Sequence, residues 1–323
     1  MFDVTRSLAP GVSPLMQHRE AGRASWKAEL VRIGLRLLIR PTDHSRTAVV
    51  AQQARMKSFE RWVPRPPKGT HTLEKPLGTI AAMRIARPNA ETGRIVLFLH
   101  GGAYVTGSPG LYRHITWRFA EAARAELVAI DYRLAPAHPF PAALDDALTA
   151  WRALLAEGAD PRRCAFLGDS AGGGLALALA LRLKDEGIPL PAAIAAIAPW
   201  TDLAATGESA APGSADPMLR SLDLHAFAHH YLQDQSALEP YASPLYGDPR
   251  GLPPTLIQVG SDEILLDDSR RMAERLRAAG VDCTLEIWPR MPHVWHAFAP
   301  LVPESGRAIA RVGDFVRTHT QVS

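Results

Sequence analysis

One serine lies between glycines in the segment Gly168-Asp169-Ser170-Ala171-Gly172. An apolar run at residues 164–167 precedes it, and an alanine- and leucine-rich stretch of helical period follows. Glycines give room for a sharp, strained turn from strand to helix, which lifts a serine hydroxyl above a sheet. The pattern predicts that Ser170 is a nucleophile. The alternatives are a plain connecting turn and a phosphate-binding loop, but no Lys-Ser or Lys-Thr pair follows the glycines.

A serine hydroxyl is a weak nucleophile at neutral pH, so it needs a nearby base that a carboxylate orients. His293 and His296 lie late in the chain, in the loop after the apolar run at residues 284–288. A late loop is the expected place for the base when the chain order is Ser, acid, His. We predict His293 as the base because it follows Pro292 at the start of this loop, and His296 as a packed or surface histidine.

Two carboxylates compete for the orienting role. Asp262 and Glu263 both follow the apolar strand predicted at residues 255–259. Either one can reach a late histidine from there, and both can equally be solvated acids ahead of the next helix. The residues alone leave this choice open.

Two adjacent glycines, Gly101 and Gly102, follow another apolar strand at residues 95–99. The transition state of acyl transfer carries a negative oxygen, and each preorganised N–H donor stabilises it by about 3 kcal/mol. Glycines let backbone N–H groups approach a ligand without obstruction. We predict an oxyanion hole formed by the N–H groups of Gly101, Gly102 and Ala171, the residue after the nucleophile.

These residues need a scaffold that brings strand ends together. Apolar runs typical of strands recur at residues 95–99, 127–130, 164–167, 192–198, 255–259 and 284–287. Segments of helical period lie between several of them, at residues 143–156, 173–184 and 268–279. Strands that alternate with helices predict an α/β fold with a mainly parallel sheet covered on both faces.

Two segments break this alternation, residues 1–75 and residues 204–235. The first contains a basic amphipathic segment, with one face made by Leu30, Ile33, Leu37 and Leu38 and the remainder carrying Lys27, Arg32, Arg36 and Arg40. Such a helix more often packs on its own protein than on a membrane, so we expect no membrane contact. We expect both segments to form a cap over the carboxyl edge of the sheet, and residues 76–203 and 236–323 to form the core.

Composition excludes several classes of protein. The formal net charge is +3 and the arginines are spread along the chain, so nothing indicates nucleic-acid binding. The two cysteines, Cys164 and Cys283, show no metal or disulfide pattern. The N-terminus lacks a basic segment followed by an apolar one, and no run of about 18 apolar residues occurs. We therefore expect a cytoplasmic protein without a metal site.

Four ordered segments together resemble the hormone-sensitive-lipase-like family of bacterial esterases, known as family IV: HGGAYVTGS at 100–108, DYRLAPAHPFPAALDDA at 131–147, GDSAGGGLA at 168–176 and APWTDL at 198–203. The resemblance covers residues 70–318. It implies an α/β-hydrolase fold with an eight-stranded, mostly parallel sheet and a helical cap. It also implies hydrolysis of short- to medium-chain carboxylic esters without a cofactor, and a homodimer through the edge strand from Thr284 to Ile287.

The chain departs from the family pattern at two places. Ala103 replaces the third glycine of the family's HGGG motif, which keeps the N–H group but narrows backbone freedom. In the family, the acid of the triad precedes a second Asp by four residues. When the family motif is aligned to this sequence without gaps and Asp267 is taken as the second Asp, the acid position is Glu263. Asp262 would need an insertion. The resemblance therefore implies a triad of Ser170, Glu263 and His293, and leaves Asp131, Tyr132 and Arg133 a structural role.

The sequence thus predicts a serine carboxylesterase that acts through an acyl-enzyme, with a small-molecule ester as its substrate. An amidase or peptidase is an alternative because the triad does not distinguish esters from amides. A binding protein on the same fold is a weaker alternative, since such receptors lack the histidine that His293 supplies. We expect Tyr104, Trp200 and Trp295 to shape the acyl pocket.

Overall fold

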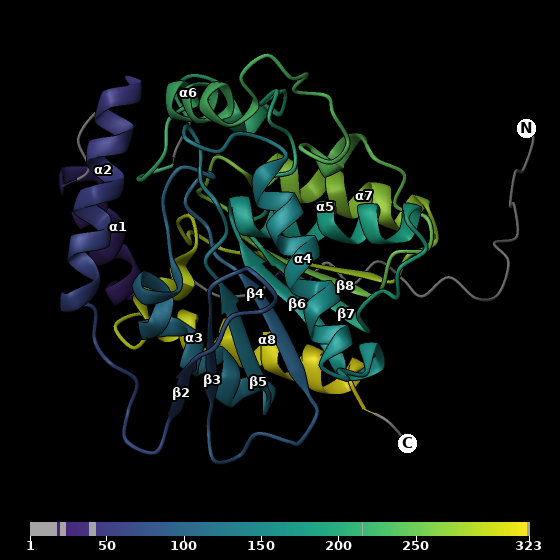
Figure 1. Cartoon of the computed structure of the whole chain (residues 1–323). Helices are drawn as coiled ribbons and strands as arrows, with labels where there is room; N and C mark the ends of the chain where they lie inside the picture. The colour runs from purple at the N-terminus through teal and green to yellow at the C-terminus, as the bar shows by residue number, and fades with distance from the viewer. Residues whose placement is uncertain (1–17, 20–23, 39–42, 215, 322–323) are drawn as a thin grey trace, which may run out of the picture.

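The computed structural model describes residues 18–19, 24–38, 43–214 and 216–321. A nine-stranded sheet runs through it in the order β1-β9-β8-β7-β6-β4-β5-β3-β2 (Figure 1). The strands are β1 (His18–Arg19), β2 (His71–Glu74), β3 (Ala82–Ala86), β4 (Ile95–Leu99), β5 (Glu126–Ile130), β6 (Cys164–Asp169), β7 (Ala193–Ile197), β8 (Thr255–Gly260) and β9 (Cys283–Trp288).

The sheet is parallel except at β3, which pairs antiparallel with both β2 and β5. Strands β4 to β9 pair in parallel with one another, in the order β9-β8-β7-β6-β4-β5. The predicted eight strands are thus present, and the two-residue β1 adds a ninth beside β9.

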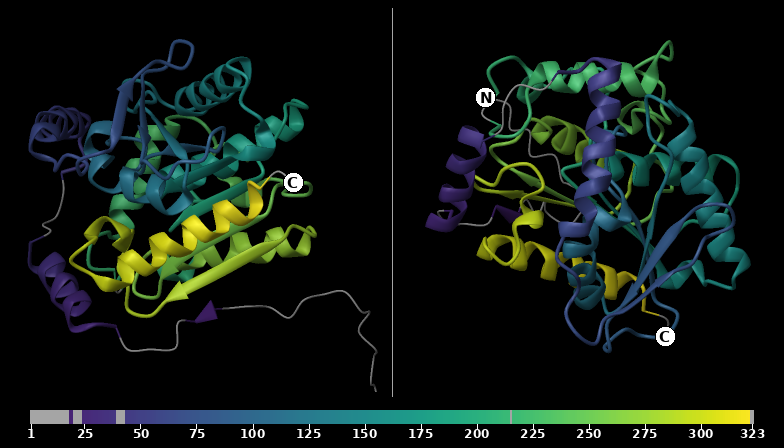
Figure 2. Two further views of the ribbon diagram at one scale, coloured as in Figure 1. Left: turned by 90° about the horizontal axis from the view of Figure 1, so that it is seen from below. Right: turned by 60° about the vertical axis from the view of Figure 1, so that its left-hand side comes forward.

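Helices cover both faces of the sheet, as Figures 1 and 2 show. The α-helices are α1 (Trp26–Leu38), α2 (Arg46–Phe59), α3 (Pro109–Ala123), α4 (Ala142–Ala156), α5 (Ala171–Asp185), α6 (Ser221–Leu232), α7 (Leu266–Ala278) and α8 (Pro303–His319). Short 3-10 helices are η1 (Glu60–Trp62), η2 (Pro161–Arg163), η3 (Glu208–Ala210), η4 (Pro244–Tyr246) and η5 (Trp295–Phe298). The predicted α/β class is confirmed.

Alternate side chains of each central strand enter two separate cores. In β4, Leu97 and Leu99 pack with residues of α4, α5 and α7, whereas Val96 and Phe98 pack with residues of α3 and α8. Burying one such side chain stabilises the fold by about 1.5–3 kcal/mol. This explains why the strands read as continuous apolar runs, and it makes the sheet a rigid base for the residues at its carboxyl edge.

The two segments that we expected to form a cap contact each other. The His230 side chain on α6 donates a hydrogen bond to the carbonyl oxygen of His44, just before α2, at 2.6 Å. The Gln53 amide on α2 donates to the carbonyl oxygens of Val105 and Ala135, both at 2.7 Å. These bonds attach α2 to α6 and to the core, whereas the exact domain boundaries stay a prediction.

One side of α1 faces away from the protein. Ala28 is buried and Val31 packs beside it, but Leu30, Ile33 and Leu37 are exposed. The helix packs on the protein, as we expected, but Ala28 and Val31 make the contact instead of the larger residues of its apolar face. None of the helices in the described ranges is long and apolar enough to cross a bilayer.

The edge of β9 is partly covered within the chain. β1 pairs with it in parallel, His18 opposite Glu286 and Arg19 opposite Ile287. A homodimer through this strand stays a prediction, and it would require β1 to leave those two positions.

Candidate active site

Ser170 lies at the turn from β6 into α5, with φ 54° and ψ −124°. This backbone conformation is strained for a residue with a side chain and costs about 1–3 kcal/mol. The flanking glycines allow this turn because backbone atoms approach them too closely for a side chain. A Cβ on Gly168 would lie 2.2 Å from the carbonyl oxygen of Gly172, and one on Gly172 would lie 2.0 Å from that of Leu99. The predicted strand-turn-helix geometry is therefore present.

A line of hydrogen bonds connects Ser170, His293 and Glu263. The Nε2 atom of His293 lies 3.0 Å from Oγ of Ser170, and its Nδ1 atom lies 3.1 Å from Oε1 of Glu263. The other carboxylate oxygen of Glu263 accepts from the N–H of Gly260 at 2.8 Å. All three side chains are buried, with 9%, 6% and 3% of Ser170, His293 and Glu263 exposed. The structure thus brings together one hydroxyl, one imidazole and one carboxylate.

The surroundings of His293 favour its protonated form. Burial alone lowers its pKa, but the hydrogen bond and charge of Glu263, with the charges of Asp216 and Asp169, outweigh burial and raise the pKa above its usual value. A base that must hold a proton during the reaction benefits from this stabilisation.

Asp262, the competing acid, lies in a different set of contacts. Its carboxylate is 3.6 Å from Arg32 on α1 and 3.8 Å from Arg290, and it accepts from the hydroxyl of Ser261 at 2.9 Å. The carboxylate in contact with His293 is that of Glu263. Between the two candidates, the geometry therefore agrees with Glu263.

The loop after β4 differs from our expectation at Gly101. Its N–H donates to Oδ1 of Asp169 at 3.0 Å, so it is already engaged and does not agree with the predicted role in the oxyanion hole. Among the residues that the structure describes, the N–H groups of Gly102, Ala103 and Ala171 have no acceptor. Gly102 and Ala103 have φ values of +116° and 55°, and a Cβ on Gly102 would lie 2.2 Å from the carbonyl oxygen of Thr106. The tight loop therefore requires glycine at 102.

Asp169 is a residue whose importance the sequence did not reveal. It directly precedes Ser170, and its buried carboxylate accepts from both the Gly101 N–H and the Tyr112 hydroxyl, the latter at 2.8 Å. Burial raises its pKa to about 6. The carboxylate thus joins the nucleophile turn to the glycine loop. Its position beside Ser170 was the only signal, because its partners on other elements are not visible in the sequence.

In Asp169→Ala the Gly101 N–H would lose its acceptor, and the glycine loop could shift away from the oxyanion position. We expect this variant to lower kcat by about 100-fold with little change in KM, because the loss of one oxyanion donor has an effect of about that size. Asp169→Asn keeps an acceptor for that N–H and should restore much of kcat. Steady-state kinetics with a p-nitrophenyl ester check this. Equal kcat in wild type and Asp169→Ala would exclude the positioning role.

A cavity of about 330 Å³ opens above Ser170. Its lining includes Trp200 and His293 from the core and Gln52, Leu224 and Phe227 from the helices α2 and α6. The expected role of Trp200 in shaping the pocket agrees with this lining.

Two other aromatic residues that we expected in the pocket do not line it. Tyr104 is buried and stacks on Tyr231 with ring centroids 3.8 Å apart, and Trp295 packs against Trp288. Neither belongs to the lining of the cavity over Ser170. His296 is fully buried and lies 2.8 Å from the amide oxygen of Gln258, so it is the packed histidine that we expected.

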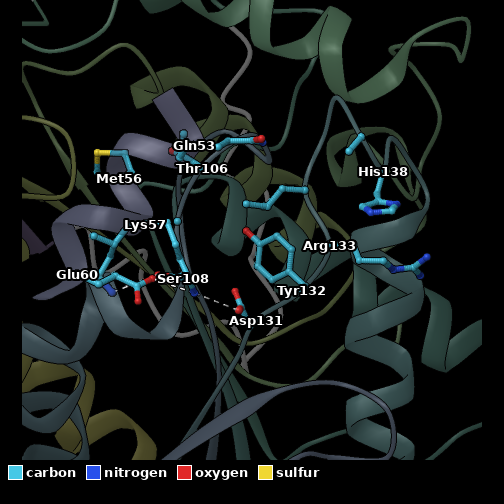
Figure 3. A pocket seen from close by; sticks show the side chains of 15 residues that line it. Gln53, Met56, Lys57, Glu60, Thr106, Ser108, Asp131, Tyr132, Arg133 and His138 are labelled. Atoms are coloured by element: carbon cyan, nitrogen blue, oxygen red, sulfur yellow. Dashed lines mark hydrogen bonds and ion pairs between the residues drawn. The ribbon is translucent and has the colours of Figure 1, made fainter. Parts of the chain in front are cut away.

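A second cavity, of about 460 Å³, lies behind the glycine loop and is shown in Figure 3. Lys57 on α2 lies 3.2 Å from Glu60 and 3.8 Å from Asp131, and the hydroxyl of Ser108 donates to Glu60. Ser108 also accepts from the N–H of Leu111, at the start of α3. The network connects α2 to the start of α3 and to the end of β5, and it therefore stabilises the segment between β4 and α3.

The DYR segment contacts the same loop. The Tyr132 hydroxyl donates to the carbonyl oxygen of His100 at 2.6 Å, and Arg133 pairs with Asp146 at 2.8 Å. These contacts agree with the structural role that we expected. Among the described residues, no group of three His, Cys, Asp or Glu side chains is placed to hold a metal ion.

Known proteins share this fold. The family model described as alpha/beta hydrolase fold matches residues 96–297. An acetyl-hydrolase of Streptomyces hygroscopicus is 47% identical over 235 residues, which cover 72% of this chain and 79% of the relative. The crystal structure of an esterase/lipase from an uncultured bacterium superposes with a TM-score of 0.86 at 39% identity, over 92% of this chain and 99% of that one.

A crystal structure described as an esterase from the bacterial hormone-sensitive lipase family has a TM-score of 0.85 at 39% identity, over 93% of this chain and 100% of that one. The fold and these relatives define an α/β hydrolase. Within that class, the chain belongs to the hormone-sensitive-lipase-like esterases of family IV. It is a carboxylic ester hydrolase.

Proposed function

We propose that this chain is a serine carboxylesterase in which Ser170, His293 and Glu263 form the catalytic triad and Ser170 carries a covalent acyl group. The observation that carries the proposal is the unbroken line of two hydrogen bonds from Ser170 through His293 to Glu263, at 3.0 and 3.1 Å, under an apolar-lined cavity. A hydroxyl oriented in this way matches the requirements of nucleophilic catalysis.

In the first step, Oγ of Ser170 attacks the ester carbonyl while Nε2 of His293 takes its proton. The collapse of the tetrahedral intermediate breaks the bond to the alcohol, which leaves with the proton from His293. A water molecule then loses a proton to His293 and attacks the acyl carbon, and the acid departs as Ser170 regains its proton. Glu263 stays ionised and stabilises the imidazolium form of His293 throughout.

We propose that the N–H groups of Gly102, Ala103 and Ala171 hold the oxyanion. This replaces Gly101 with Ala103, because the Gly101 N–H donates to Asp169 whereas the other three lack an acceptor in the described structure. The Ala171 N–H lies in the first turn of α5, where the helix itself leaves N–H groups unpaired and adds its positive dipole end.

The cavity over Ser170 supports short- to medium-chain esters as substrates. Its volume is about 330 Å³, and Leu224 and Phe227 of α6 lie along its lining. Such a site binds apolar groups of limited size by removing their surface from water.

A nucleophile-competition experiment tests this function. With methanol present, a phenyl and a p-nitrophenyl ester of the same short acid should give the same ratio of methyl ester to free acid, because both pass through one acyl-enzyme. Ratios that depend on the leaving group would mean that water attacks the bound ester directly. A run of esters from C2 to C16 should show the highest kcat/KM among the shorter acids.

A further inference from the structure

The helices α1 and α2 lie on the same side of the molecule (Figures 1 and 2), and together with η1 they carry seven large apolar side chains that are exposed. We call this surface the apolar flank. Its members are Trp26, Leu30, Ile33 and Leu37 on α1, Val50 and Phe59 on α2, and Trp62 on η1, with exposed fractions between 47% and 77%. Single exposed apolar residues are ordinary, but several on one face of a helix, as on α1, mark an interaction surface.

The four residues on α1 form one continuous stripe. Their spacing of four, three and four residues places them on the same face of the helix. The opposite side holds the helix to the protein, because Ala28 is buried in the cluster with Trp288 and Met291. The helix is therefore anchored by one face while its larger apolar side chains point outward.

Charge identifies the partner. Residues 26–68 carry ten Lys and Arg against three Asp and Glu, whereas the whole chain carries 36 against 33. The remainder of the chain therefore has more acidic than basic residues, and the basic excess lies in the segment of the sequence that carries the apolar flank. A distribution of this kind orients a protein toward an anionic surface.

The aromatic residues of the flank lie beside cations. Lys27 lies over the ring of Trp26 at 5.8 Å, and Arg61 over that of Trp62 at 5.4 Å. Exposed tryptophans next to basic side chains are typical of helices that lie in the interface between lipid headgroups and acyl chains.

We propose that the apolar flank docks this enzyme on the surface of a bilayer that contains anionic phospholipids, with α1 lying in the plane of the interface. Trp26, Leu30, Ile33 and Leu37 would enter the headgroup region, and the basic residues around them would face lipid phosphates. A second copy of the chain fits this surface poorly, because a symmetric contact would press two basic regions together.

Docking through this flank would bring the site close to the lipid. α2 contributes Gln52 to the lining of the cavity over Ser170, and Gln53 ties the same helix to the loop after β4. Apolar esters concentrate at such interfaces, so the substrate would meet the protein on the side where α2 borders the cavity. The docking itself does not depend on the triad, since its test measures binding.

Co-sedimentation of the full chain with vesicles tests the proposal. Binding is expected to vesicles of phosphatidylcholine with one third phosphatidylglycerol, to weaken as salt is raised, and to be much weaker on phosphatidylcholine alone. The double variant Leu30→Asp/Leu37→Asp should bind the mixed vesicles at least tenfold more weakly. It should keep wild-type turnover of a soluble acetate ester, which also shows that it is folded.

Leu238→Asp is the matched control, because Leu238 is a leucine exposed by 53% outside the flank, and this variant should bind like wild type. The proposal is overturned if wild type does not sediment with the mixed vesicles, or if the double variant and wild type bind equally. A doubled mass in light scattering that disappears in the double variant would also overturn it and assign the flank to a second copy.

Discussion

Replacement of Ser170 with alanine is expected to lower kcat on p-nitrophenyl butyrate by about a millionfold, the loss typical of removing the nucleophile from a serine triad. The reason is that the Oγ atom makes the new bond to the substrate, and it belongs to the hydroxyl that lies 3.0 Å from Nε2 of His293. The measurement is steady-state hydrolysis followed by p-nitrophenol release.

The double variant Ser170→Ala/His293→Ala provides the control for this prediction. The two residues act as one unit, so the double variant should be hardly slower than either single variant. Additive losses, or wild-type turnover in Ser170→Ala, would show that the two side chains do not share a step. Thermal melting of each variant would verify that the fold is retained.

Replacement of Glu263 with glutamine is expected to lower kcat by about 10⁴-fold, because a neutral amide neither orients the imidazole correctly nor stabilises its positive charge. The pH profile should change as well. The Glu263 carboxylate raises the pKa of His293, and catalysis needs the neutral imidazole, so activity falls as the pH drops through that pKa. Without the carboxylate the pKa falls, and the acidic limb of kcat/KM should move to lower pH.

Asp262→Asn is the matched control for this second prediction, since it removes the neighbouring carboxylate. Asp262 lies near Arg32 and Arg290, not beside His293, so its loss should change kcat by less than about tenfold. A larger loss in Asp262→Asn than in Glu263→Gln would reverse the assignment of the acid.

The sequence predicted the parts of the site that depend on local pattern. The nucleophile turn needs glycine at 168 and 172 because neighbouring carbonyl oxygens leave no room for a Cβ, and that requirement appears as a short motif. The strands were visible because both of their faces are buried, which makes them apolar throughout. Gapless comparison with the family motif selected Glu263, the acid that contacts His293.

Contacts between elements that are distant in the chain could not be predicted from the sequence. The sequence favoured the Gly101 N–H as an oxyanion donor. In the structure this N–H donates a hydrogen bond to the Asp169 carboxylate, and the two residues are 68 positions apart in the chain. Tyr104 lies next to the glycine loop in the chain, yet its ring stacks on Tyr231 and does not line the pocket. The helical period shows that α1 has an apolar face, but it does not show which side of the helix packs on the protein. In the structure the side that carries the small residue Ala28 is buried.

The central claim is that Ser170 forms the covalent intermediate, and labelling with a p-nitrophenyl alkylphosphonate tests it most directly. The nucleophile attacks the phosphorus atom, p-nitrophenol leaves, and a stable phosphonyl adduct remains on the nucleophile. Intact-protein mass spectrometry should show one adduct per chain, peptide mapping should place it on Ser170, and Ser170→Ala should remain unlabelled. An adduct on another residue, or full inactivation of the enzyme without an adduct on Ser170, would contradict the account.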